Sequence, residues 1–378
     1  MRALIVGGGI GGLTLAAFLQ NSNVEYDIIE KAPDWDHMGF LVSIWDSGRD
    51  ILRKLGLAEE FDRLGCRADQ YIIRDGKGRA LLTIDLEELI VNYGSSVTII
   101  ERAALHNLLR SKVDQTRLRM STTMQSAEQT NDKVAVTFSD GSRQEYDIVV
   151  GADGVHSQVR NLAFRDAAEE YENWRIWYTW IDNEFNEPGT VSEYVEPREF
   201  TIVCSARNKT TAWFFAPADH RVWDTVEGRA ARLRELFKYE TKLLPAVEKL
   251  RDEDIMPTDL LRMKLKSWSN GRFVLLGDAA HILGPLAGMG SSMAMEDAYT
   301  LAGEIMRIST LYPMDTAFKN YERKRKHRVR YVEKMGREMH FGMLIKSRAL
   351  RSIMNRLFPL TPRRYLFSNV NELLRNEI

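Results

Sequence analysis

The residues of this sequence best suited to chemistry are three glycines that precede an acid. Gly7, Gly9 and Gly12 have the spacing G-x-G-x-x-G, and Glu30 follows them. The first glycine permits a tight turn, the second lets the backbone approach a pyrophosphate, and the third allows a helix to pack on the preceding strand. An acid about twenty residues later suits hydrogen bonding to a ribose hydroxyl. The pattern predicts dinucleotide binding.

Two further segments combine glycines with polar residues after an apolar run. Residues 146–150 lead into the sequence Gly-Ala-Asp-Gly, and residues 272–276 lead into Gly-Asp-Ala-Ala-His. Ser157 could cap the helix after the first of them. The second continues through more glycines into a helix predicted for residues 291–306, whose dipole would stabilise negative charge at its start. We therefore expect three ligand-facing loops at the carboxyl ends of buried strands.

The elements that must position these loops follow from the apolar patterns. Residues 3–6 and 26–29 read as buried parallel strands, and residues 13–19 read as the helix between them. Together they form a βαβ unit. Residues 118–120, 133–138 and 146–150 are predicted as a meander of strands that ends at the second loop.

Two segments with the sequence pattern of antiparallel strands interrupt this parallel arrangement. Residues 71–75 and 80–84 are predicted to form a hairpin about a glycine-rich turn, and residues 171–261 are rich in strands and aromatic residues. We predict one domain from residues 1–68, 93–170 and 262–330, and a substrate-binding domain from residues 69–92 and 171–261. Residues 331–378 are expected to form a C-terminal helical segment.

Composition excludes several classes of protein. The chain has 378 residues with a net charge of −1, which offers no electrostatic footprint for nucleic acid. Its two cysteines, Cys66 and Cys204, predict a reducing, cytoplasmic compartment without a disulfide or metal site. No apolar run reaches the length of an integral membrane segment. The basic run 323–328 is expected to be a solvated helix face, and Glu296 and Asp297 to be acids favoured near a helix start.

The three loops, taken in this order, resemble those of the class A FAD-dependent monooxygenases of the p-hydroxybenzoate hydroxylase fold. Urate hydroxylases, salicylate hydroxylases and tetracycline-inactivating monooxygenases belong to this group. The resemblance covers residues 1–330. It implies an α/β fold with a Rossmann-like FAD-binding domain, an inserted antiparallel β-sheet substrate domain and C-terminal helices.

The resemblance also assigns cofactor-binding residues. Asp278 matches an acid that hydrogen-bonds the ribityl chain, and Asp153, Gly154 and Arg160 match a motif implicated in both FAD and NAD(P)H binding. The loop at residues 285–292 matches the one lining the reactive face of the flavin. No residue is assigned as a nucleophile or general base, and His281 is expected to order its loop. The full implied set is Gly7, Gly9, Gly12, Glu30, Lys31, Ser43, Arg102, Asp153, Gly154, Arg160, Gly277, Asp278, Pro285, Gly288, Gly290 and Ser291.

Two positions depart from the family pattern. Many relatives carry an arginine where this chain has Asp36 and His37, which leaves the mode of NAD(P)H contact open. The turn that often reads Gly-Gln-Gly-Ala-Asn is Gly-Met-Gly-Ser-Ser at residues 288–292. A smaller hydroxyl thus replaces an amide.

The implied reaction is reduction of FAD by NAD(P)H, addition of O2 to give a flavin C4a-hydroperoxide, and hydroxylation of an aromatic or polycyclic small molecule by a monomer or homodimer. Three alternatives stay open. A prenyl-lipid reductase would use the same cofactor without oxygen, and a redox-silent protein would hold FAD structurally. A flavin halogenase is disfavoured because residues 177–182 do not fit its Trp-x-Trp-x-Ile-Pro signature.

Overall fold

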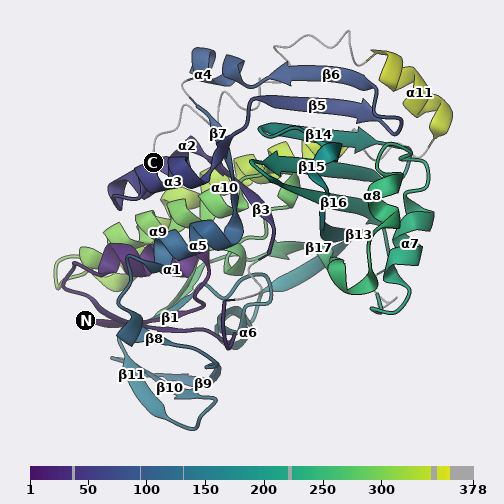
Figure 1. Ribbon diagram of the computed structural model, residues 1–378. Helices are drawn as coiled ribbons and strands as arrows, with labels where there is room; N and C mark the ends of the chain where they lie inside the picture. The colour runs from purple at the N-terminus through teal and green to yellow at the C-terminus, as the bar shows by residue number, and fades with distance from the viewer. Residues whose placement is uncertain (36–38, 94, 131, 220–223, 342–346, 358–378) are drawn as a thin grey trace.

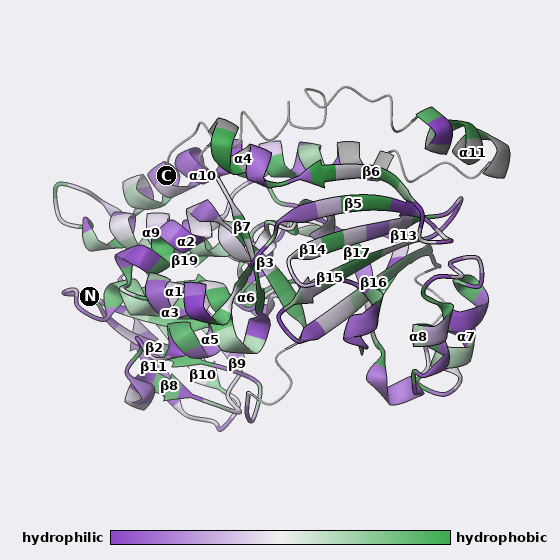
Figure 2. Ribbon diagram, turned by 45° about the horizontal axis from the view of Figure 1, so that its top comes forward, coloured by the Kyte–Doolittle hydropathy of each residue, from purple (hydrophilic) through white to green (hydrophobic). Residues whose placement is uncertain are grey.

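A computed structural model describes residues 1–35, 39–93, 95–130, 132–219, 224–341 and 347–357 (Figure 1). Two sheets of different character dominate it. One is six-stranded and lies with the N-terminus among helices α1 (Ile10–Leu19), α5 (Arg102–Arg110) and α9 (Gly290–Met306) (Figures 1 and 2). The other is seven-stranded and carries helices α7 (Arg229–Leu236) and α8 (Leu244–Glu248) at its outer side.

The six-stranded sheet has the order β18-β19-β12-β1-β2-β8. Strands β1 (Arg2–Val6) and β2 (Glu25–Ile29) pair in parallel, and α1 (Ile10–Leu19) connects them, which confirms the βαβ unit. Residues 3–6 of β1 are buried and apolar, as expected for a strand that is covered on both faces. The remaining strands are β8 (Leu118–Arg119), β12 (Ile148–Gly151), β18 (Ser269–Asn270) and β19 (Phe273–Leu275).

The expected single strand at residues 146–150 is wrong, because the chain changes sheet at Asp147. Strand β11 (Arg143–Tyr146) pairs antiparallel with β10 (Val134–Phe138), whereas β12 pairs parallel with β1. The Asp147 carboxylate marks the break by accepting hydrogen bonds from the Arg2 amide and the Lys133 ammonium, both at 2.7 Å. Strand β9 (Met124–Gln129) is the third strand of the β11-β10-β9 sheet and was not predicted, since its sequence is largely polar.

The seven-stranded sheet has the order β17-β13-β16-β15-β14-β5-β6. The predicted hairpin is confirmed as β5 (Gln70–Asp75) and β6 (Ala80–Asp85), and β5 joins the sheet through a parallel pairing with β14 (Thr190–Val195). The other strands are β13 (Ala168–Ile181), β15 (Phe200–Ala206), β16 (Lys209–Pro217) and β17 (Met256–Lys264). All of these pair antiparallel with their neighbours.

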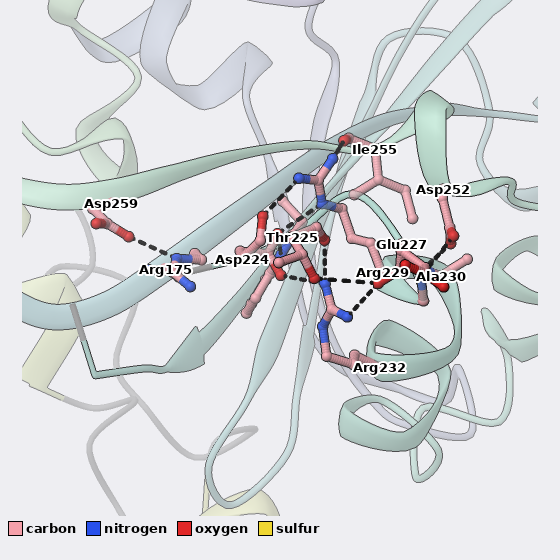
Figure 3. A network of polar contacts seen from close by, with 12 residues as sticks. Arg175, Asp224, Thr225, Glu227, Arg229, Ala230, Arg232, Asp252, Ile255 and Asp259 are labelled. Carbon is pink, nitrogen blue, oxygen red and sulfur yellow. Dashed lines mark hydrogen bonds and ion pairs between the residues drawn. The ribbon is translucent and has the colours of Figure 1, made fainter. Parts of the chain in front are cut away.

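Successive side chains along these strands point to opposite faces of the sheet, so they pack into two different hydrophobic cores. On β16, Phe214 packs with α7 (Arg229–Leu236) and α8 (Leu244–Glu248), while Phe215 faces the opposite way. Asp224 fastens the start of α7 by accepting hydrogen bonds from Arg229 at 2.7 Å and Arg232 at 2.9 Å (Figure 3).

A three-stranded sheet, β3-β7-β4, lies between the two larger ones. Its strands are β3 (Leu41–Trp45), β4 (Cys66–Arg67) and β7 (Val97–Glu101). Neighbouring residues of β7 serve different cores, because Ile99 packs with the seven-stranded sheet and Ile100 with the six-stranded one. The small sheet therefore joins both interiors.

Helices complete the molecule. Helices α2 (Asp46–Lys54) and α5 (Arg102–Arg110) contact the small sheet, and α3 (Ala58–Leu64) packs on both of them. Helix α4 (Glu87–Tyr93) follows β6, and α6 (Gln158–Ala163) follows the second loop. The C-terminal part contains α9 (Gly290–Met306), α10 (Met314–Phe341) and α11 (Arg348–Leu357). The end of the predicted C-terminal segment, residues 358–378, lies outside the described residues. Among the helices that the structure describes, none combines the length and apolarity needed to span a membrane.

Glu240 is an acid buried under the seven-stranded sheet, and it should make stability depend on pH. Its side chain accepts a hydrogen bond from Thr201 at 2.6 Å through Oε2, while Oε1 has no hydrogen-bond partner among the described residues. Burial raises the pKa of Glu240 well above its usual range, and the Thr201 hydrogen bond opposes this only in part. The folded protein thus keeps a proton that the unfolded chain loses above about pH 4.3.

We expect the free energy of unfolding to fall as pH rises above that value, by up to about 1.4 kcal/mol per pH unit from this group alone. Glu240→Gln should remove this contribution because the amide does not ionise. Urea unfolding between pH 5 and pH 8 measures the slope. Glu235→Gln, at an exposed acid, is the control, and equal slopes for wild type and Glu240→Gln would contradict the assignment.

Candidate active site

A cavity of about 470 Å³ lies where the three predicted loops meet the seven-stranded sheet. The loops converge because β1, β12 and β19 are parallel neighbours, so their carboxyl ends share one edge. Gly12 and Arg160 do not line the cavity. The predicted cofactor-binding residues that do are Gly7, Gly9, Glu30, Lys31, Ser43, Arg102, Asp153, Gly154, Gly277, Asp278, Pro285, Gly288, Gly290 and Ser291.

The glycines of the first loop have distinct geometries. Gly7 has a φ of +106°, and a Cβ there would lie 2.4 Å from the Ala152 carbonyl oxygen. A Cβ at Gly12 would lie 2.0 Å from the Gly7 oxygen, so this glycine permits the contact between helix and strand. By contrast, a Cβ at Gly9 would have no atom within 4 Å. Gly9 therefore faces open space at the start of α1.

The start of α1 is suited to binding an anion. No side chain caps it, and its first turn contains no acid. The first amide groups of a helix lack partners within the helix and carry the positive end of its dipole. Together with the space beside Gly9, they form a cradle for a diphosphate.

Glu30 lies at the end of β2, within reach of this cradle. Its Oε2 accepts a hydrogen bond from the Gly8 amide at 2.8 Å, and its Oε1 accepts one from the Ala32 amide at 2.9 Å. Each oxygen keeps further acceptor capacity toward the cavity. Sequence reasoning missed His106, whose buried ring nitrogen Nε2 lies 2.8 Å from the Gly8 carbonyl oxygen and supports the loop from behind.

The polar residues of the second loop mainly form hydrogen bonds within the loop and with the start of α6. Asp153 accepts hydrogen bonds from the amides of Gln158 at 2.7 Å and Val159 at 3.1 Å. The predicted cap is confirmed, since the Ser157 hydroxyl accepts a hydrogen bond from the Arg160 amide at 3.0 Å. Asp153 therefore faces the cavity with a carboxylate already bound to the start of α6.

Arg160 lies behind the cavity wall. It is fully buried, donates to the carbonyl oxygens of Ala279 at 3.0 Å and Val155 at 2.5 Å, and pairs with Glu169. Its guanidinium thus connects the second loop to the third. The direct cofactor contact implied for Arg160 has no support in this placement.

The third loop presents an acid and a helix start to the cavity. Asp278 follows Gly277, whose φ is +58°. Asp278 is exposed to the cavity but is surrounded by protein, and this desolvation raises its pKa, an effect that His281 and Arg102 partly offset. Helix α9 begins at Gly290 with no side-chain cap and no acid in its first turn. Its dipole is therefore available for negative charge on a ligand.

The hydroxyl that replaces an amide in this turn has a structural use here. Ser292 Oγ accepts a hydrogen bond from the Trp45 backbone amide at 3.0 Å, which fixes the start of α9 against β3. The other departure, at Asp36 and His37, lies outside the described residues.

The seven-stranded sheet supplies the opposite wall of the cavity. Ile176, Tyr178, Trp213 and Leu260 line it. The Tyr178 ring stacks on Phe40 with centroids 5.9 Å apart and meets Trp213 edge-on at 5.4 Å. Its hydroxyl has no hydrogen-bond partner among the described residues, and burial raises its pKa.

The charge on this wall is neutralised locally. Asp259 lines the cavity, and Arg175 donates to its carboxylate at 2.7 Å (Figure 3). The rest of the wall is mainly apolar and aromatic. A flat apolar ligand would fit between this wall and the glycine-rich third loop.

The fold and the site define an enzyme that binds a dinucleotide cofactor. One end of the cavity offers a diphosphate cradle and a ribose acceptor, and the other offers an acid, an uncapped helix start and an aromatic wall. This arrangement fits FAD. Gly9, Glu30 and the start of α1 would hold its ADP half, and Asp278 with the start of α9 would hold its flavin half.

Comparisons with known proteins agree with this reading. Residues 1–335 match the family described as FAD binding domain. The chain is 30% identical to 3-amino-4-hydroxybenzoate 2-monooxygenase PtmB3 of Streptomyces platensis, over 89% of this chain and 87% of that protein. It is 26% identical to 6-hydroxynicotinate 3-monooxygenase of Bordetella bronchiseptica, over 89% of this chain and 91% of the relative.

Solved structures share the fold. Klebsiella pneumoniae HpxO, complexed with FAD and uric acid, superposes with a TM-score of 0.88 at 22% identity, covering 99% of this chain and 96% of that one. Tetracycline destructase Tet(51) gives a TM-score of 0.77 at 21% identity, covering 100% and 98%.

The chain belongs to the FAD-binding family of class A flavin monooxygenases. It is an oxidoreductase of the FAD-dependent monooxygenase type, and FAD is its cofactor. The predicted family and fold class are confirmed. The comparisons do not favour the reductase or halogenase alternatives.

Proposed function

We propose that this protein is a single-component monooxygenase that uses NAD(P)H and O2 to hydroxylate an aromatic or polycyclic small molecule. One oxygen atom enters a C–H bond of the substrate, NAD(P)H supplies two electrons, and the second oxygen atom leaves as water. Bound FAD supplies the electron transfer and the activation of oxygen. The observation that carries the proposal is the wall formed by Tyr178, Trp213 and Ile176 opposite the third loop.

The residues of this chain orient the reactants and exclude water. The start of α9 would stabilise negative charge at the flavin edge, since Gly290 and Ser291 line the cavity and the helix start has no side-chain cap. The apolar wall would keep the reacting atoms dry and hold a planar ring against the cofactor. No side chain needs to act as a nucleophile for this chemistry.

Two relatives suggest the size of the substrate. Their printed names specify 3-amino-4-hydroxybenzoate and 6-hydroxynicotinate, each a single substituted ring. We propose a substituted aromatic or heteroaromatic ring as the first class to test, with polycyclic compounds second. A monomeric or homodimeric state and a cytoplasmic location also stay predictions.

The proposal is tested by following NAD(P)H oxidation under air with phenols, hydroxypyridines, fused aromatics and polyketides. A substrate should accelerate oxidation and gain the mass of one oxygen atom without matching release of peroxide. An isoprenoid that gains hydrogen under anaerobic conditions would instead support the reductase.

Tyr178→Phe should weaken substrate binding. Tyr178 lines the cavity, and its hydroxyl, which stays protonated because burial raises its pKa, can donate to a substrate oxygen. Loss of one such bond corresponds to about a 10-fold higher substrate Kd, with more peroxide per NAD(P)H oxidised. Substrate titration against flavin absorbance measures the effect. Tyr194→Phe, in the core on the other face of the sheet, is the control, and equal effects of both changes would contradict the assignment.

A further inference from the structure

A cluster of charged side chains lies behind the third loop, away from the cavity lining. Glu296 and Asp297 of α9 are completely buried, and Arg325 of α10 is only 2% exposed. The acids are therefore not ordinary residues of a helix start. The basic run 323–328 is solvated only in part, because Arg323, Lys324 and His327 are exposed whereas Arg325 and Arg328 are buried.

Asp297 connects three separate segments. Its Oδ2 accepts a hydrogen bond from the Gly277 amide at 3.0 Å and lies 2.6 Å from His281 Nε2. Its Oδ1 accepts a hydrogen bond from Arg325 Nε at 2.7 Å. Gly277 immediately precedes Asp278, and His281 follows it. The Asp297 carboxylate therefore binds both ends of the turn that contains Asp278.

Arg325 and Glu296 extend this connection to α10. Arg325 Nη1 lies 2.6 Å from Glu296 Oε2, and Arg328 Nε donates to the same oxygen at 2.6 Å. A continuous series of hydrogen bonds and ion pairs therefore connects the third loop to α10. It runs from Gly277 through Asp297, Arg325 and Glu296 to Arg328, with donors and acceptors in alternation. The arginines lie 28 and 32 positions beyond the acids to which they donate.

Such a cluster is costly to bury, so its position calls for a function. Removing a charge from water costs several kcal/mol, and a hydrophobic set of similar volume is often as stable. Burial raises the pKa of Asp297, but His281 and Arg325 outweigh this effect and hold it below its usual value. The charge is therefore retained where it anchors the third loop.

We propose that Asp297 is a positioning residue that fixes the turn at Gly277 and thereby aims Asp278 at the cofactor, with Arg325 holding Asp297 in place. Helix α10 becomes part of the flavin site through this contact, although neither Asp297 nor Arg325 lines the cavity.

The test measures FAD affinity and the midpoint potential of the bound flavin in Asp297→Asn. The amide cannot accept all three hydrogen bonds and carries no charge to balance Arg325. We expect the FAD Kd to rise about 10-fold or more and the potential to shift. The matched control is Glu304→Gln, since Glu304 is also a buried acid of α9, lies about two helical turns beyond Asp297, and is bound by Lys324 of α10 at 2.7 Å. It should lower thermal stability and leave both flavin readouts unchanged.

His281 supplies a second pair of variants in case Asp297→Asn does not fold. His281→Gln can still donate to Asp297, whereas His281→Leu cannot, so glutamine should restore most of the FAD affinity that leucine loses. The proposal is overturned if folded Asp297→Asn keeps both the affinity and the potential of the wild type. It is also overturned if Glu304→Gln loses FAD to the same extent, or if His281→Gln and His281→Leu behave alike. Each measurement uses substrate-free holoenzyme, so its outcome does not depend on the substrate proposed above.

Discussion

Asp278→Ala is expected to purify as a colourless protein that has lost FAD. The Asp278 carboxyl lies in the cavity at the end of β19, where the family resemblance implies a hydrogen bond to the ribityl chain. Hydrogen bonds to a charged group are worth about 1.5–3 kcal/mol, so losing one or two of them should weaken FAD binding about 100-fold or more. The ratio of flavin to protein absorbance after gel filtration measures retention.

Asp259→Asn serves as the control, because Asp259 is an acid of the same cavity on the opposite wall. It should retain FAD. Asp278→Asn should fall between wild type and alanine, since the amide keeps one acceptor oxygen. A yellow Asp278→Ala protein with one FAD per chain would exclude the assigned role of this acid.

The second prediction is that substitutions at Gly12 and Gly9, two glycines of the same motif, have different consequences. Gly12→Ala should prevent stable folding, because its Cβ would lie 2.0 Å from the Gly7 carbonyl oxygen, a backbone atom that cannot move aside as a flexible side chain can. Forcing such an overlap costs about 3 kcal/mol or more. Gly9→Val should fold normally, since a Cβ at Gly9 would have no atom within 4 Å and its φ of −75° suits any residue. Its side chain would instead occupy the space expected for the diphosphate.

Thermal unfolding without added FAD and FAD titration distinguish these outcomes. Gly9→Val should have a melting temperature close to that of the FAD-free wild type and no measurable FAD binding. Gly12→Ala should be largely unfolded or insoluble. If Gly9→Val bound FAD normally, the diphosphate would have to lie elsewhere.

The elements nearest the site were predictable because their signals are local. Gly7, Gly9 and Gly12 follow one short apolar strand, and Ser157 precedes the helix that it caps. The hairpin of β5 and β6 was predictable for the same reason, since its strands are joined by a glycine turn. Its parallel partner β14 begins more than a hundred residues later, and no local pattern specifies that pairing.

The errors arose where a distant partner decides the outcome. The acids at 296 and 297 and the arginines at 325 and 328 have ordinary helical sequences, and only the packing of α9 on α10 buries them together. His106 reaches Gly8 across 98 positions. Asp147 breaks an apolar run, but its role in moving the chain between two sheets depends on Arg2 and Lys133.

The small sheet between the two cores bears on how this enzyme can evolve. Ile99 and Ile100 are neighbours in sequence and are held by different interiors, so changes in β7 are felt on both sides at once. Ile176 and Tyr178 lie on β13, and Trp213 lies on β16, strands that take no part in the small sheet. Because these strands lie outside the sheet that joins the two cores, we expect substitutions at these positions to alter the proposed substrate binding and to leave the nucleotide cradle intact.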